Sequence, residues 1–375
     1  MLSARPAGAT TRPVAREDGN HHHGTPQPPR VTIGVDTHKD LHVAAARDQL
    51  GRRLATTQVE ASGAGYAQLL GWARSLGQVQ AWGVEGTSSY GAGLARFLAA
   101  HHQQVWEVNR PDRAARRHRG KSDPVDADAA ARTVQAGEAS GTPKAQDGRV
   151  EMLRALRVAR HSAVKARTQT INAIKALLVT APTELREQLA TLPTTALIRQ
   201  AATLEPGTLA TPTAATMLAV GGLARRYQHL DAEIGLLTGK LDQLTAKTAP
   251  KLRALLGVGP DSAAALLICA GDNPSRLRSE AALAALCGSS PVEASSGKTR
   301  RHRLNRGGDR QANAALHRIV IVRLRWHQPT RDYLARRTTQ GKTKKEIIRC
   351  LKRYVAREVF AALRQTDQHD LTAAA

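Results

Sequence analysis

Four carboxylates in the first third of the chain have the types and spacing that phosphodiester chemistry requires. Asp36 and Glu85 each end a short apolar run, and Asp123 and Asp126 follow three residues apart, a spacing that puts both on one face of a helix. Cleavage of phosphodiesters by two metal ions needs several carboxylates around a pair of Mg²⁺ ions that lie about 4 Å apart. The four residues therefore predict a two-metal site.

Each carboxylate taken alone has a simpler explanation. Asp123 could only cap a helix, and Glu85 could only lie at a solvated strand end. The metal site is preferred because four such residues occur in this order in a strongly basic chain. Asp40 and Asp128 are close enough in sequence to be mistaken for members of the site. Asp128 lies two residues from Asp126, so the two face different sides of a helix.

The segments that would position these carboxylates alternate between short apolar strands and helices. Strands are predicted at 31–36, 41–46, 53–60, 79–85 and 104–108, and helices at 61–76, 89–101 and 123–136. A turn near residues 48–51 would join the second and third strands. The order β-β-β-α-β-α-β-α predicts a mixed sheet with helices on its faces, which is the order of ribonuclease-H-like nucleases. Residues 31–146 are therefore expected to form an α/β domain of the RNase H or RuvC type.

Residues 147–247 read as a helical arm. One long helix is predicted from Gly148 to about Pro182 and a second from Ala214 to Lys247, with a proline-broken segment between them. Apolar positions in the second helix alternate in steps of four and three at Leu223, Tyr227, Leu230, Ile234, Leu237, Leu241 and Leu244. This spacing is typical of a coiled-coil seam and favours a homodimer.

Residues 248–375 form a third, mainly helical unit. The stretch from Leu255 to Leu267 resembles a helix-hairpin-helix, in which the Gly257 and Gly259 turn would present backbone N–H groups to a phosphate. Between Lys298 and Arg353 there are 18 Lys and Arg residues and only three acidic ones. This segment is the expected contact with nucleic acid.

Composition supports the same partner. The chain has 375 residues, enough for two to three domains, and carries 55 Lys and Arg against 31 Asp and Glu, a net charge of +24. Arg supplies 42 of the cations, which suits phosphate contacts, although a coding bias towards Arg explains part of the excess. Aromatic residues make up only 3%, so stacking on single-stranded bases cannot be the main binding device.

Other classes of protein are excluded or disfavoured. Cys269, Cys287 and Cys350 are far apart in sequence and predict neither a disulfide framework nor a zinc site. No apolar run reaches the ~20 residues of a membrane span, so no membrane partner is expected. The segment from Met1 to Arg30 (residues 1–30) reads as a disordered tail and lacks the apolar core of a signal peptide. A cytoplasmic protein acting on the nucleoid is expected.

Three motifs around the carboxylates resemble those of one family. Val-Asp36-Thr-His-Lys-Asp, Gly-Val-Glu85-Gly-Thr-Ser-Ser-Tyr and Lys-Ser-Asp123-Pro-Val-Asp126-Ala are similar to the DEDD motifs of the insertion-sequence 110 transposases. These are bridge-RNA-guided recombinases with a RuvC-like N-terminal domain. The C-terminal motifs of that family are matched by Leu-Gly-Val-Gly-Pro260, Cys-Gly-Ser-Ser-Pro291, Ser-Ser-Gly-Lys298 and Asn-Arg-Gly-Gly-Asp-Arg310. The resemblance covers about residues 31–365.

The resemblance implies a transposase that joins DNA strands through a serine. In that family the second domain supplies a serine nucleophile in a Ser-Gly step shortly after a proline, which falls on Ser296, with Ser295 as its rival. Mg²⁺ on the four carboxylates, double-stranded DNA, a guide RNA and a homodimer or higher oligomer are implied with it. Phosphate contacts are expected from Gly257, Gly259, Lys298, Arg300, Arg301, Arg303, Arg306 and Arg310. The serine segment is richer in Arg than is typical of the family, which leaves the choice between the two serines open.

Two other functions fit part of the sequence. A RuvC-like endonuclease or junction resolvase would use water as the nucleophile and would not need Ser296. A nucleic-acid-binding protein without catalysis would not need Asp36 and would leave the order of the four carboxylates unexplained. The transposase is the preferred hypothesis.

Overall fold

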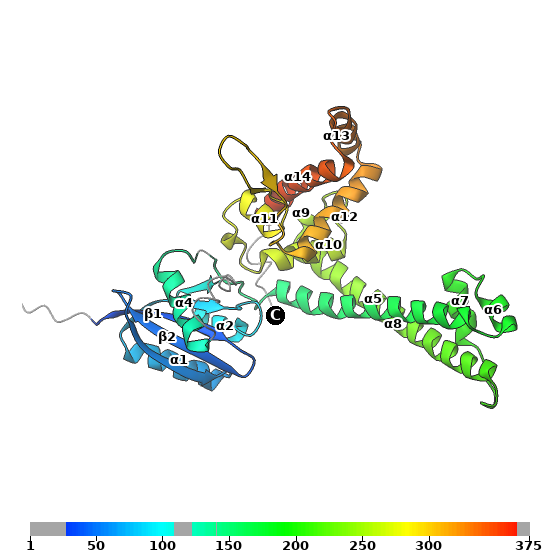
Figure 1. Cartoon of the computed structure of the whole chain (residues 1–375), viewed down its shortest axis with the longest axis horizontal. Coiled ribbons are helices and arrows are strands. Elements are labelled where there is room, and N and C mark those ends of the chain that lie inside the picture. The colour runs from blue at the N-terminus through cyan, green and yellow to red at the C-terminus, as the bar shows by residue number, and fades with distance from the viewer. Residues whose placement is uncertain (1–27, 109–121, 140, 366–375) are drawn as a thin grey trace, which may run out of the picture.

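The computed structural model describes residues 28–108, 122–139 and 141–365. Figure 1 shows an α/β unit, a long arm of two helices, and a second helical unit at the base of the arm. The expected N-terminal tail lies outside the described residues except at its end, where Arg30 already belongs to a strand. Residues 109–121, which precede Asp123 and include the cations from Arg110 to Lys121, also lie outside them.

The N-terminal unit contains the predicted mixed sheet. Its strands are β1 (Arg30–Thr37), β2 (Leu41–Asp48), β3 (Arg53–Glu60), β4 (Gln78–Glu85) and β5 (Val105–Val108), in the order β3-β2-β1-β4-β5. The first three strands form an antiparallel meander, and β4 and β5 run parallel to β1. The central strand β1 is buried on both faces, which explains its continuous apolar run. The expected ribonuclease-H-like arrangement is confirmed.

Helices cover both faces of this sheet. They are α1 (Gly63–Ser75), α2 (Ala92–Ala100) and α4 (Asp123–Gln135). Side chains alternate between the two faces of a strand. Val31, Ile33 and Val35 of β1 therefore share one core with α1 and α2, whereas the alternate residues face α4. This second face carries the site described below.

Two glycines let α4 lie unusually close to the sheet. Gly34 of β1 is paired with Gly83 of β4. A Cβ atom built on Gly34 would lie 2.0 Å from the carbonyl oxygen of Ala127, and one built on Gly83 would lie 2.8 Å from that of Ala130. Since no side chain fits in this space, the helix backbone packs directly on the strands.

The middle of the chain is an antiparallel pair of long helices, α5 (Arg149–Val179) and α8 (Pro212–Thr248), as Figure 1 shows. Both predicted long helices are confirmed. Two short helices, α6 (Thr183–Leu189) and α7 (Thr194–Ala202), close the far end of the arm. Each begins directly after a proline, Pro182 or Pro193, whose ring fixes a backbone angle that suits the start of a helix.

The predicted coiled-coil seam of α8 packs against α5 of the same chain. Ile234 and Leu241 are buried, and Arg160 Nε donates a hydrogen bond of 2.7 Å to Thr238 Oγ1 across the pair. The seam pattern therefore reflects a pairing within one chain. The seam therefore no longer supports the predicted homodimer, which has to be argued from other features.

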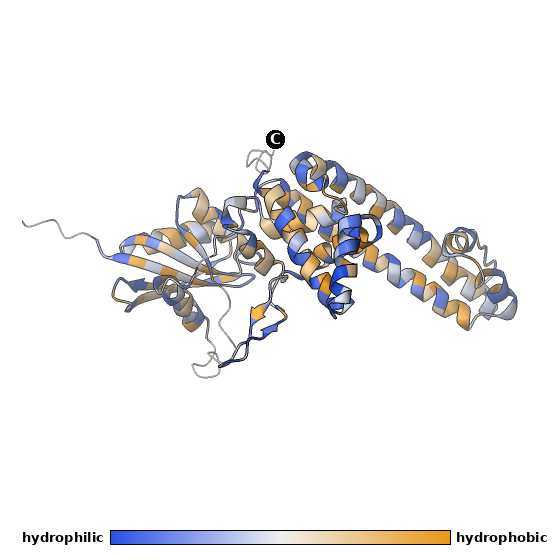
Figure 2. Ribbon diagram, turned by 90° about the horizontal axis from the view of Figure 1, so that it is seen from above, coloured by the Kyte–Doolittle hydropathy of each residue, from blue (hydrophilic) through white to orange (hydrophobic). Residues whose placement is uncertain are grey.

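The C-terminal unit is mostly helical, as predicted. Its elements are α9 (Pro250–Arg253), α10 (Pro260–Ala270), the 3₁₀ turn η1 (Pro274–Arg276), α11 (Glu280–Leu286), β6 (Val292–Glu293), β7 (His302–Arg303), α12 (Arg310–Trp326), α13 (Gln328–Thr339) and α14 (Lys344–Arg364). The nearly all-apolar helix α10 lies at the centre, packed against α5, α8 and α12. Figure 2 shows apolar and polar residues mixed along these helices, and the apolar ones supply the core of the unit.

The stretch predicted to be a helix-hairpin-helix contains a connection and α10, and the one-turn helix α9 precedes it. Gly257 in the connection has φ +87°, a conformation that other residues rarely adopt, and Gly259 precedes α10. Cys269 and Cys287 are free thiols whose sulfurs lie 4.0 Å apart in the core. No helix within the described residues is long and apolar enough to cross a membrane.

Candidate active site

Two of the predicted carboxylates lie at neighbouring strand ends. β1 and β4 are parallel with Val35 opposite Val84, so Asp36 and Glu85 come one residue beyond this pair. Both belong to the face that α4 covers, because they alternate with Val35 and Val84. Asp36 is 8% exposed and Glu85 is 3% exposed. The Thr37 hydroxyl also donates to the Glu85 carbonyl at 2.9 Å, which fixes the two strand ends to each other.

The other two predicted carboxylates are in the first turn of α4. The helix begins after Ser122, which has an extended backbone, and Asp126 is buried at 7% exposure while Asp123 is half-buried. A helix N-terminus favours negative charge, so the start of α4 suits both residues. The close approach of α4 to Gly34 and Gly83 brings this turn over the end of β1.

His38 belongs to the same cluster, and the sequence analysis did not single it out. Its Nε2 atom lies 3.2 Å from Asp36 Oδ2 and 3.5 Å from Asp123 Oδ1. One ligand atom from each of Asp36, His38 and Asp123 can be chosen so that all lie within 4.8 Å of one another. The available signal was its place two residues after Asp36, which puts both residues on the same face of the chain as it leaves β1.

The electrostatics of this cluster fit a bound cation. Burial raises the pKa of Asp36, the nearby charge of His38 opposes this shift, and the carboxylates of Asp126 and Asp123 add to it, leaving the pKa above its usual range. Carboxylates that raise one another's pKa in a buried place repel in the absence of a positive charge. The oxygen donors of Asp36 and Asp123, joined by the His38 imidazole, thus form a donor set suited to a divalent metal ion.

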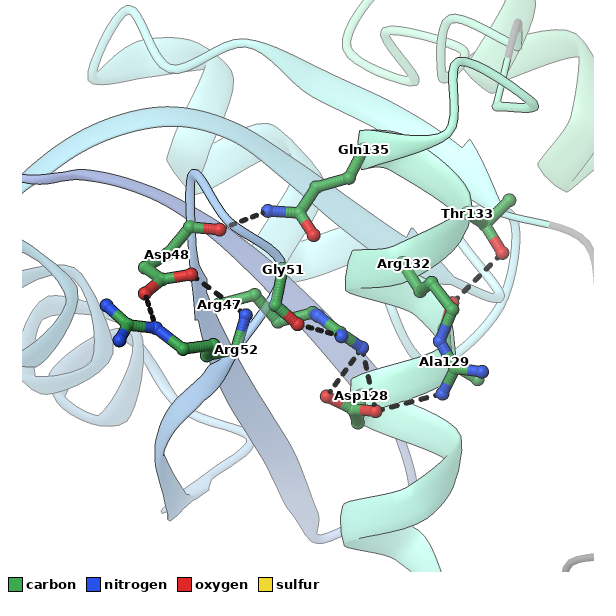
Figure 3. Close-up of polar contacts among 9 residues, drawn as sticks. All are labelled: Arg47, Asp48, Gly51, Arg52, Asp128, Ala129, Arg132, Thr133 and Gln135. Carbon is green, nitrogen blue, oxygen red and sulfur yellow. Dashed lines mark hydrogen bonds and ion pairs between the residues drawn. The ribbon is translucent and has the colours of Figure 1, made fainter.

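Asp128 has a structural role, as its position on the helix predicted. It accepts from Arg47 Nη1 of β2 and from Arg132 Nη2 of its own helix, both at 3.0 Å, as Figure 3 shows. Gln135 of the same helix donates to the Asp48 carbonyl at 2.7 Å. These contacts hold α4 on the strands and keep the Asp128 side chain away from the carboxylate cluster.

The predicted serines lie on a β-hairpin of the C-terminal unit, formed by β6 and β7. Backbone hydrogen bonds of 3.1 Å join Ser296 and Thr299 in both directions, so Gly297 and Lys298 form a two-residue turn. Gly297 has φ +56°, and Lys298 does not have a positive φ, which corresponds to a type II′ turn. The glycine after the serine is thus required by the turn.

The two serines differ in their hydrogen bonds. The Arg301 amide donates to Ser295 Oγ at 3.2 Å, and the Ser295 hydroxyl is 3.4 Å from the Arg301 carbonyl. The hydroxyl of Ser296 makes no hydrogen bond with the described residues, and the residue is exposed at the hairpin tip. Ser296 is therefore the freer of the two.

The hairpin lies apart from the carboxylate cluster. In Figure 1 it projects from the C-terminal unit beside α11, with a clear separation from β1 and α4. The structure thus brings Asp36, Asp123 and Asp126 together with His38, and it places Glu85 at the neighbouring strand end. It does not place Ser296 beside them within one chain.

The predicted phosphate-binding residues are distributed over three places. Lys298, Arg300 and Arg301 are exposed around the hairpin tip, Arg303 and Arg306 follow at its base, and Arg310 begins α12. Gly257 and Gly259 lie before α10, whose first turn holds Asp261. Asp261 is bound by Arg157 at 3.0 Å and by Arg318 at 2.8 Å, so this helix start already has a carboxylate beside it.

Fold and cluster together define a class of protein: a metal-dependent, ribonuclease-H-like enzyme of phosphodiester chemistry. Comparison with family models refines this assignment. Residues 33–181 match a model described as a transposase, the DEDD domain of IS110 elements, and residues 249–335 match a second model, described as the transposase IS116/IS110/IS902 family. The first span contains all four carboxylates, and the second contains both serines. A comparison with curated proteins finds no match.

The chain belongs to the IS110 family of transposases. It is a DNA strand-transfer enzyme, it binds DNA, and its DEDD domain uses a divalent metal. The family resemblance seen in the sequence motifs is confirmed.

Proposed function

We propose that this transposase cuts and rejoins DNA through a covalent phosphoserine link, with Ser296 as the nucleophile. The observation that carries this choice is the free, exposed hydroxyl of Ser296 on the hairpin tip, in contrast to the bonded hydroxyl of Ser295. A serine hydroxyl is a weak nucleophile unless a base or a metal activates it. Its neighbours Lys298, Arg300 and Arg301 are cations, so the activation has to come from outside the hairpin.

Asp36, Glu85, Asp123 and Asp126 would hold two Mg²⁺ ions. When bound, such ions polarise the scissile phosphate and stabilise the leaving oxygen. The contribution of the protein is to fix these acidic groups at two strand ends and one helix start. Gly34 permits the short distance from α4 to β1. His38 lies within reach as a further ligand.

Cleavage and rejoining are then two exchanges at one phosphorus atom. The Ser296 oxygen forms a bond to phosphorus while the bond to the leaving sugar oxygen breaks. The serine proton passes to solvent, and the leaving oxygen takes up a proton. A sugar hydroxyl of the recipient strand reverses these events and releases the serine. Arg300 and Arg301 would stabilise the charge on the phosphate in both steps.

The active site would be composite and built between copies of the chain. Within one chain the hairpin lies apart from β1 and α4, so we propose a homodimer or a higher oligomer in which one copy supplies Ser296 and another supplies the carboxylates. The basic hairpin and α12 would grip double-stranded DNA at the element ends and the target. An element-encoded guide RNA would supply sequence recognition by base pairing. The reaction would take place on the nucleoid in the cytoplasm.

A denaturing-gel assay tests the serine. Protein, Mg²⁺, element-end DNA and RNA from the flanks of the element are incubated, and a covalent protein–DNA band is sought. The band should form with wild type and with Ser295→Ala and should be lost with Ser296→Ala and Asp36→Ala. DNA cleavage without a band, unchanged in Ser296→Ala, would instead indicate a nuclease that uses water.

Mixing two inactive variants tests the composite site. Ser296→Ala retains the carboxylates and Asp36→Ala retains the serine, so a mixture should restore the covalent band if the two parts come from different copies. The band should contain only the Asp36→Ala chain, which a size tag on that chain identifies. A mixture as inactive as either variant alone would place both parts in one chain.

A further inference from the structure

A cavity of about 670 Å³ lies at the base of the hairpin. Its walls come from the segment that enters the hairpin, the segment that leaves it, and one side of α14, with Asn313 of α12 and Tyr333 of α13 completing it. It lies outside the carboxylate cluster, and the serine mechanism does not use it. Its size is that of a site for a small organic group rather than for a helix of DNA.

The lining of the cavity is strongly cationic. Among the described residues that line it are six cations and no acidic residue; the cations are Arg303, Arg306, Arg349, Lys352, Arg353 and Arg357. Glu280 of α11 pairs with Arg353 at 3.0 Å and with Arg357 at 3.2 Å. Within the described part of the chain, Arg303, Arg306 and Arg349 make no ion pair.

Two of these cations are placed where an anion would stabilise them. Arg353 Nη1 is buried and has no hydrogen-bond partner in the described residues. The Lys352 ammonium group donates to Asn313 Oδ1 at 2.6 Å, while burial and the charge of Arg349 lower its pKa. A phosphate at this point would accept from Arg353 and would offset the repulsion between Lys352 and Arg349.

Aromatic rings lie beside these cations. Tyr333 and Tyr354, two of only five tyrosines in the chain, both line the cavity, with ring centres 5.6 Å apart and an angle of 75° between the rings. Arg357 lies over the Tyr354 ring at 5.7 Å, and Tyr354 remains 47% exposed. A half-exposed tyrosine backed by an arginine is a surface on which a base can stack, whatever its identity.

We propose that this cavity holds one unpaired nucleotide, with its phosphate on Arg349, Lys352 and Arg353 and its base against Tyr354. A fully paired duplex presents only its backbone at such a depth and would leave the tyrosines unused. Along the hairpin, Val292 and Ser296 are four residues apart, which corresponds to a distance on the order of 13 Å in an extended strand. The nucleotide would therefore be held about two steps along a strand from the serine tip.

The probe is a DNA duplex with one extrahelical 2-aminopurine, whose emission changes when it stacks, together with an RNA duplex of the same design. Each is titrated with the full-length protein, and the same duplexes without the bulge serve as controls. Wild type should bind a bulged duplex more tightly than the paired one and change its emission. The duplex that responds, DNA or RNA, identifies the strand that the cavity receives.

Variants locate the response. Tyr354→Ala should remove the emission change and weaken binding of the bulged duplex by roughly 5- to 100-fold, while Tyr354→Phe retains both. Arg349→Gln should lower the slope of log K against log salt for the bulged duplex by about 0.7 to 0.9. Lys345 is an exposed cation of the same helix that lies outside the cavity, so Lys345→Gln should leave this slope at its wild-type value.

Two results would overturn the proposal. One is a wild type that binds bulged and paired duplexes alike in both the DNA and the RNA series. The other is a folded Tyr354→Ala variant, verified by circular dichroism, that binds the bulged duplex with the wild-type affinity and emission change. Neither result bears on Ser296, because binding is measured without cleavage, so this proposal and the proposed function can fail separately.

Discussion

Gly34 in β1 and Gly83 in β4 are paired across the sheet, and both lie directly under the backbone of α4. This pair sets the distance between the strand that carries Asp36 and the helix that carries Asp123 and Asp126. The geometry of the carboxylate cluster thus depends on two residues that bear no functional group.

Replacing Gly34 should damage both the fold and the site. In Gly34→Ala the added carbon would collide with the carbonyl oxygen of Ala127, so α4 has to move, and we expect the N-terminal unit to lose about 2–3 kcal/mol of unfolding free energy. Denaturation can be followed by tryptophan fluorescence, because three of the four tryptophans, Trp72, Trp82 and Trp106, lie in this unit. Gly71→Ala is the control, because its added carbon would have nothing within 4 Å and alanine favours the helix. Equal stability of Gly34→Ala and wild type would contradict this account.

A divalent metal should stabilise the N-terminal unit. At a Mg²⁺ concentration 100 times its Kd, the gain in unfolding free energy should be about 2.7 kcal/mol, and Asp36→Asn should abolish it. Asp40→Asn removes an exposed acid nearby in sequence and should leave the gain unchanged. A metal-induced gain that survives in Asp36→Asn would rule out this residue as a ligand.

Without metal, the same substitution should act in the opposite direction. Burial and neighbouring carboxylates raise the folded-state pKa of Asp36, so the folded protein binds the proton more tightly than the unfolded chain does. The charged form therefore opposes folding at neutral pH. This penalty shrinks as the pH falls through the raised pKa and is gone below the ordinary pKa near 4. Asp36→Asn should be more stable than wild type in EDTA at pH 7, and the difference should vanish in acid. A less stable variant in EDTA would contradict the assigned electrostatics.

Asp261 should stabilise the junction between the arm and the C-terminal unit. It binds Arg157 and Arg160 of α5 and Arg318 of α12. Burial raises its pKa, but the charges of Arg157 and Arg318 outweigh burial and leave the pKa below its usual range. Asp261→Asn should cost about 3 kcal/mol at pH 7, since it leaves three arginines without their partner.

The pH dependence of this variant has a definite sign. Because the folded-state pKa is lowered, the contribution of the Asp261 charge is complete above the ordinary pKa near 4 and is lost as the pH falls through the folded value. The difference between wild type and Asp261→Asn in urea denaturation should therefore shrink below about pH 4. Asp231→Asn removes an exposed partner of Arg167 and should cost less than about 1 kcal/mol. A constant difference from pH 7 to pH 3 would contradict the ion-pair explanation.

Local patterns predicted the sheet, the long helices and the placement of the four carboxylates on these elements, because each depends on neighbours in sequence. Alternation along β1 and β4 is enough to place Asp36 and Glu85 at strand ends. The same patterns could not predict contacts between segments that are distant in sequence. The depth of α4 over Gly34, the place of His38 between Asp36 and Asp123, and the proximity of Cys269 to Cys287 all depend on tertiary packing.

The coiled-coil seam and the serine segment show the same limit. A heptad pattern in α8 identifies a buried stripe and does not identify what covers it, which here is α5 of the same chain. Ser295 and Ser296 could not be ranked by their sequence context. The hairpin register separates them, since it bonds one hydroxyl to Arg301 and leaves the other exposed.

The most direct test of the central claim is to locate the DNA on the protein by mass spectrometry. The covalent adduct is trapped on a DNA whose leaving fragment diffuses away, and then it is digested with nuclease and trypsin. Both candidate serines fall in one tryptic peptide, which ends at Lys298, and fragmentation of that peptide distinguishes them. The account predicts the residual nucleotide mass on Ser296. Cleaved DNA together with an unmodified peptide, or the nucleotide on any other residue, would contradict it.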